Sequence, residues 1–145
     1  MKILKSIVFS GIAILFLSIG LILRDDEIDY YRINEGGKMR TLEFIVEEQI
    51  LSKDKNCDFS NIISGTKGYL KARFKFSKSW QGYGKVAVFV NLFEEYPVVV
   101  KPDNTCEIPP EALTSSKFEV YVAGIKGKGK LTSSSVEVRQ ERSTV

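Results

Sequence analysis

Apolar and polar side chains alternate along several segments that follow Met39. In the clearest of them, residues 69–76, every second side chain is apolar and most of the others are basic. The same two-residue period recurs around Phe44 and around Val120. Because successive side chains of a strand point to opposite faces, this period predicts strands with one buried and one solvated face. Such strands are typical of antiparallel sheets.

Other segments complete a chain of short strands and turns. Residues 85–93 are apolar at both alternating sets of positions, which predicts a central strand covered on both faces. The next β-like segment is residues 96–100, and Pro97 places its beginning at a sheet edge or a bend. The polar stretch 52–67 and the Gly/Lys-rich stretch 124–130 are rich in loop-forming residues. A single last strand is expected over residues 131–138.

Together these segments predict the fold class. No run shows a sustained 3.6-residue period, and about seven short strands separated by turns are expected. The prediction is an all-β domain, an immunoglobulin-like antiparallel β-sandwich over residues 39–140, followed by a polar tail at 141–145.

The first 38 residues have a different character. Residues 6–23 are uncharged and mostly apolar, and Lys2 and Lys5 precede them. Such a run forms a helix of roughly 27 Å, enough to cross a bilayer, and the lysines favour a cytoplasmic N-terminus. Residues 1–38 are therefore a candidate transmembrane anchor plus linker. Alternatively Met39 is the true first residue and the run is a translation artefact, because codons for Glu-Gly-Gly just upstream can spell a ribosome-binding sequence.

Composition narrows the candidate chemistry. The chain has 145 residues, a formal net charge of +3 and no histidine. Without histidine it lacks the usual general base and the commonest zinc ligand, so no catalytic residue, metal site or cofactor is predicted. The small charge gives no concentrated basic face for nucleic acid. Cys57 and Cys106 are distant in sequence, and whether they pair depends on the redox compartment.

A set of spaced residues carries a resemblance to a known family. The chain is similar to a module of phage and prophage structural proteins of Firmicutes, and it resembles the N-terminal domain of baseplate upper proteins over about residues 40–138. The motif consists of Phe74, Phe76, Trp80, Gly82, Ala87, Phe89, Cys106, Ile108, Pro109, Leu113, Val120 and Val122. The resemblance implies a tail or baseplate location and no catalysis. Those relatives lack a membrane segment, which favours the start at Met39.

Two hypotheses about function follow. The first is a virion structural or assembly protein whose partners are other virion proteins or further copies of itself. The second is a membrane-anchored extracytoplasmic binding domain, held in the membrane by residues 6–23 with the β-domain outside. Basic side chains on a solvated strand face and in the Gly/Lys-rich loop are the candidate partner contacts, namely Lys71, Arg73, Lys126, Lys128 and Lys130. Trp80 is expected to belong to the core rather than to a sugar-binding platform.

Overall fold

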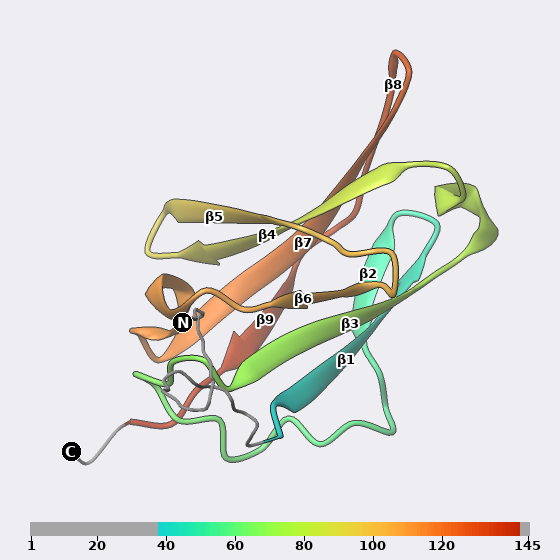
Figure 1. Cartoon of the computed structure of the whole chain (residues 1–145). Coiled ribbons are helices and arrows are strands. Elements are labelled where there is room, and N and C mark those ends of the chain that lie inside the picture. Colours follow the sequence, from blue (N-terminus) through green and yellow to red (C-terminus); the bar gives the residue numbers. More distant parts are fainter. Residues whose placement is uncertain (1–37, 143–145) are drawn as a thin grey trace, which may run out of the picture. The chain divides into compact units, whose positions relative to one another are not determined.

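Two β-sheets stack face to face in the computed structural model of the chain, which describes residues 38–142 (Figure 1). Two short 3-10 helices, η2 and η3, interrupt the strands. The elements are β1 Arg40–Glu47, β2 Ile50–Lys53, β3 Leu70–Phe76, η2 Lys78–Trp80, β4 Gly84–Asn91, β5 Glu94–Val99, β6 Thr105–Glu107, η3 Pro110–Leu113, β7 Lys117–Lys126, β8 Gly129–Thr132 and β9 Val136–Arg139.

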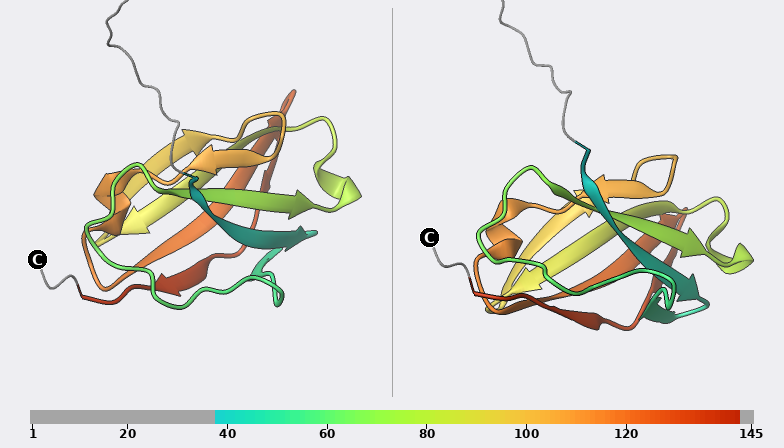
Figure 2. Two further views of the ribbon diagram at one scale, coloured as in Figure 1. Left: turned by 60° about the horizontal axis from the view of Figure 1, so that its bottom comes forward. Right: turned by 90° about the horizontal axis from the view of Figure 1, so that it is seen from below.

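The strands divide into a four-stranded and a five-stranded sheet. The first has the order β2-β1-β3-β6, and the second has the order β5-β4-β7-β8, with β9 also paired to β7. Both views of Figure 2 show β1 and β3 lying across the sheet that contains β4 and β7. The described part of the chain is therefore an all-β sandwich, as its alternation predicts.

The core lies between the inner faces of the two sheets. Leu42, Phe44 and Val46 of β1 are fully buried, so the alternation read from the sequence is confirmed there. Phe44 stacks on Phe74 of the neighbouring strand with ring centroids 5.4 Å apart. Phe89 packs against Phe118 of the adjacent strand within the five-stranded sheet at 6.1 Å. Aromatic rings thus fill much of the space between the sheets.

One pairing departs from the predicted antiparallel arrangement. β1 pairs with β3 in parallel, from Arg40 opposite Leu70 to Val46 opposite Phe76. The β1–β2 hairpin reverses the chain, and the segment 54–69 then carries it back to the end where β1 begins. β3 therefore starts beside the start of β1 and runs in the same direction, because a connection of this length permits parallel pairing.

Two further expectations about strands are wrong. Residues 38–142 contain nine strands rather than about seven, since β2 occupies the start of the stretch predicted as a loop. The expected single strand 131–138 is broken into β8 and β9 at residues 133–135, where the side chain of Ser133 turns inward and accepts the Val122 N–H at 2.9 Å. The Gly/Lys-rich loop is also shorter than expected, because β7 continues to Lys126 and β8 begins at Gly129.

The predicted strand 85–93 is also too long. β4 ends at Asn91, and Leu92 and Phe93 form a two-residue turn into β5. β4 is central in its sheet, between β5 and β7. The expectation that both faces of this strand are covered is met only in part: on the outer face Val88 is buried, whereas Val86 and Val90 are half-buried. β5 is an edge strand, as Pro97 predicts.

The apolar segment 6–23 and the true start of the chain lie outside the described residues. Within residues 38–142, none of the helices is long and apolar enough to cross a membrane. At the other end, Glu141, predicted to begin a polar tail, still belongs to the folded domain. Its N–H donates to the Ile62 carbonyl at 2.6 Å, and its carbonyl accepts the Ser64 N–H at 2.9 Å.

Candidate functional site

The residues of the family-like motif form the interior of the sandwich. Nine of the twelve are buried: Phe74, Trp80, Ala87, Phe89, Cys106, Ile108, Leu113, Val120 and Val122. Phe76 and Pro109 are half-buried, and Gly82 is exposed with a φ of 82°. The motif residues therefore pack the core, apart from Gly82, which lies in a turn, and by themselves they form no binding site.

Trp80 is fixed in the core, as expected. Its side chain is fully buried, and the indole N–H donates to the Glu48 carbonyl at 2.7 Å. Phe76 packs on the indole with ring centroids 5.3 Å apart. The Ser79 hydroxyl donates to the Glu48 carboxylate at 2.6 Å, which adds a second bond between η2 and the β1–β2 turn. This tryptophan therefore joins η2 to the first hairpin.

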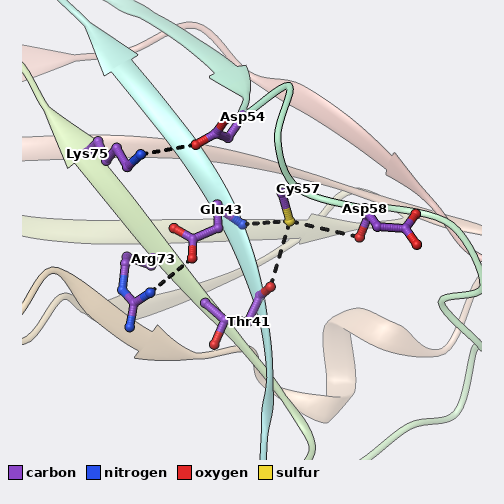
Figure 3. A network of polar contacts seen from close by, with 7 residues as sticks. All are labelled: Thr41, Glu43, Asp54, Cys57, Asp58, Arg73 and Lys75. Atoms are coloured by element: carbon purple, nitrogen blue, oxygen red, sulfur yellow. Dashed lines mark hydrogen bonds and ion pairs between the residues drawn. The ribbon is translucent and has the colours of Figure 1, made fainter.

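A network of ion pairs covers the outer face of β1 and β3 (Figure 3). Arg73 pairs with Glu43 at 2.9 Å, and Lys75 pairs with Asp54 at 3.2 Å. The pKa of Asp54 is lowered, chiefly by the hydrogen bond from the Asn56 backbone N–H and then by Lys75. The predicted solvated basic face is confirmed, but the Arg73 and Lys75 charges are engaged within the chain. Lys71 is half-buried beside them.

A hollow beside this network is organised by Arg40. A space of about 450 Å³ is bounded by the start of β1 and the loop 56–61. The Arg40 guanidinium donates to the carbonyls of Asp58, Ser60 and Asn61 at 2.9, 2.7 and 3.1 Å. Three of the five guanidinium N–H donors thus bind the loop, and the arginine holds the loop in place.

The two cysteines lie in different environments and are both free thiols. Cys57 is half-buried in the same loop, and its sulfur accepts the Glu43 N–H at 3.4 Å (Figure 3). Cys106 is buried in β6, and burial raises the pKa of its thiol to about 12 although Lys101 opposes the shift. The prediction that Cys106 is a small core residue rather than a reactive thiol is confirmed by its burial.

The β7–β8 hairpin presents the basic residues predicted as partner contacts. Lys126, Lys128 and Lys130 are all exposed on it, and the hairpin projects beyond the rest of its sheet in Figure 1. The Lys126 ammonium lies 5.6 Å from the centre of the Tyr83 ring, within cation–π range. The hairpin thus carries positive charge away from the core, in position to meet an acidic surface.

The sequence interpretation missed the turn between β4 and β5. Leu92 and Phe93 occupy it with φ angles of 52° and 73°, and they are 74% and 100% exposed. Two-residue hairpin turns with positive φ at both positions favour Asn-Gly. For other residues the left-handed conformation costs roughly 1–2 kcal/mol each. Two large apolar side chains are therefore exposed in a backbone geometry that neither favours.

The comparisons with known proteins do not assign the chain to a family. No protein-family model matches the chain, and no curated protein matches it either. Within residues 38–142 no group of three or more acidic, cysteine or histidine side chains is arranged to hold a metal ion. The geometry described above singles out two surface features, the apolar β4–β5 turn and the basic β7–β8 hairpin.

Proposed function

We propose that this domain is a structural or assembly module of a phage or prophage virion, of the tail or baseplate type, which acts by protein–protein association. The observation that carries this proposal is the β4–β5 turn, where Phe93 is 100% exposed in a strained backbone conformation. Aromatic side chains, phenylalanine among them, are enriched at protein–protein interfaces relative to the rest of the surface. The motif residues support the same proposal through the family that they resemble.

The topology supports the finer assignment to an immunoglobulin-like sandwich. β3 pairs with β6 in one sheet, and β4, β7 and the β8–β9 pair follow one another in the other. These pairings correspond to the B–E and C–F–G neighbours of immunoglobulin domains. The parallel β1–β3 pair is a departure at the first strand. A rigid sandwich of this kind fits a module that holds its turns in fixed positions for partners.

Mass spectrometry of purified virions tests this proposal, with the N-terminal peptide identified. Peptides of this chain in particles induced from its host, in constant ratio to tail proteins, are the expected result. Their absence from intact particles, with the chain present in the lysate, refutes a virion role.

A membrane-anchored extracytoplasmic binding domain is the second candidate, and the uncharged run 6–23 favours it. In that case the chain starts at Met1, sediments with host membranes and is cut by protease added outside the cell. A chain that begins at Met39 eliminates this candidate.

A further inference from the structure

The β4–β5 turn combines an apolar tip with acidic surroundings. Leu92 and Phe93 are followed directly by the exposed residues Glu94 and Glu95. Glu119 lies beside them, since it pairs with Val90 at the end of β4. Basic side chains at this end are engaged within the chain, because Lys117 and Arg139 both contact the Glu137 carboxylate, at 3.3 and 2.7 Å. A partner for this tip therefore needs an apolar hollow with a basic rim.

The opposite end of the same domain has a hollow with lysines at its rim, in which Phe76 is the accessible aromatic ring among mostly polar lining residues. A space of about 240 Å³ opens between the end of β3, η2 and the start of β4. Its floor contains the half-buried ring of Phe76, which packs on Trp80. Lys78 and Lys85 line it. The Lys85 ammonium lies 5.0 Å from the centre of the Phe76 ring and donates to the Tyr83 carbonyl at 3.2 Å. The nearby carboxylate of Glu48 is engaged by the Ser79 hydroxyl.

The tip and the hollow cannot meet within one chain. β4 begins at Gly84 beside the hollow and ends at Asn91 beside the tip, and eight residues of strand span roughly 23 Å. Figure 1 shows η2 and the β4–β5 turn at opposite ends of the domain. Two complementary surfaces at opposite ends of a rigid body join successive copies head to tail, which closes a ring or extends a filament.

We infer that a second copy of this chain is the partner of the β4–β5 turn. Phe93 of one copy enters the hollow floored by Phe76 in the next, and Glu94 and Glu95 pair with Lys78 and Lys85. Charge complementarity favours this occupant over an anionic lipid surface, which the two carboxylates next to the tip would repel. The inference rests on the proposed association function and names its first partner.

Sedimentation velocity of the full chain over a range of concentrations tests the apolar contact. The variant Leu92→Asn/Phe93→Gly gives the turn the residue pair that its backbone favours. We expect the midpoint of its urea denaturation to rise, and its dissociation constant for self-association to increase at least about tenfold. If the variant remains folded but no longer associates, the loss of association is not caused by unfolding of the domain. An unchanged mass distribution overturns the inference.

Charge exchange tests the direction of the contact. Glu94→Lys/Glu95→Lys and Lys78→Glu/Lys85→Glu each place like charges at the interface, so each variant alone is expected to stay monomeric. Mixed together they restore complementary pairs, and association returns. Lys55→Glu, an exposed lysine in the loop that follows β2, is the matched control and leaves association unchanged. Self-association that persists in each variant, or a mixture that stays monomeric, overturns the inference.

These results separate this inference from the proposed function. If the chain is present in virions but the Phe93 variant associates as the wild type does, the virion role stands and the head-to-tail contact is refuted. If the chain is absent from virions but its association depends on Phe93 and returns on charge exchange, the contact stands and the virion role is refuted.

Discussion

Gly124 and Gly84 offer a matched pair of substitutions whose effects on stability should have opposite signs. Both glycines lie in the β4–β7 ladder, where Gly124 pairs with Lys85 and Gly84 pairs with Ile125. A Cβ atom at position 124 would lie 3.1 Å from the Trp80 ring and 3.1 Å from the Tyr83 side chain. A Cβ atom at position 84 would meet only the Ile125 carbonyl, at an ordinary 3.8 Å.

The magnitudes follow from two opposing effects. Replacing glycine by alanine in a compatible backbone stabilises a protein by about 0.4–1 kcal/mol, because the unfolded chain loses freedom. Overpacking a filled site costs about 1–3 kcal/mol. Trp80 cannot move away easily, since its indole is fully buried and hydrogen-bonded to Glu48. Gly124→Ala should therefore lower the free energy of unfolding by about 1–2 kcal/mol, and Gly84→Ala should raise it by about 0.5 kcal/mol.

Urea denaturation followed by tryptophan fluorescence measures both effects. The chain has one tryptophan, which is buried, so its emission reports directly on the site that Gly124→Ala disturbs. Gly84→Ala is the control for the change in backbone freedom. If Gly124→Ala proves as stable as Gly84→Ala, then Trp80 and Tyr83 give way freely, and the close packing argued for this corner is refuted.

Three more changes test the loop, the thiols and the acid response. Arg40→Ala removes the donors that hold the loop 56–61, so limited proteolysis should cut that loop while the sandwich stays folded; equal protection in both proteins refutes its role. A thiol reagent at pH 8 should modify Cys57 alone, since burial raises the Cys106 pKa to about 12; two modified thiols per native chain contradict this. The native pKa of Asp54 is lowered, so its contribution to stability is present above its unfolded pKa of about 4 and is lost as the pH falls. Asp54→Asn should reduce the acid-induced loss of stability in urea titrations, and an unchanged pH profile contradicts the pairing.

The strands with strict alternation could be predicted from the sequence because burial decides their pattern. β1, β3 and β7 each place every second side chain in the core, and no other arrangement hides those side chains. The parallel pairing of β1 with β3 was not predictable, because alternation gives the buried face of a strand and not its neighbour. The break before β9 depends on Ser133, whose hydroxyl bonds to β7 across the sheet.

The β4–β5 turn was missed because its residues carry no turn signal. Asn-Gly or a similar pair marks most two-residue hairpins, whereas Leu92-Phe93 continues the apolar run of β4. The length of that run was the available signal. Residues 84–99 exceed the usual length of a strand, so a reversal within them was required.

The same turn shows where local preference and overall fold disagree in this domain. At Gly124 the residue suits its position, because the aromatic packing leaves no room for a side chain. At Leu92 and Phe93 the backbone geometry and the exposure both oppose the residues present. In natural proteins such conflicts occur mainly at functional sites. Phe76, half-buried at the other end of the domain, keeps part of its ring accessible in the hollow beside η2. Since β4 separates the two, one chain cannot cover both, but consecutive copies joined end to end cover each of them.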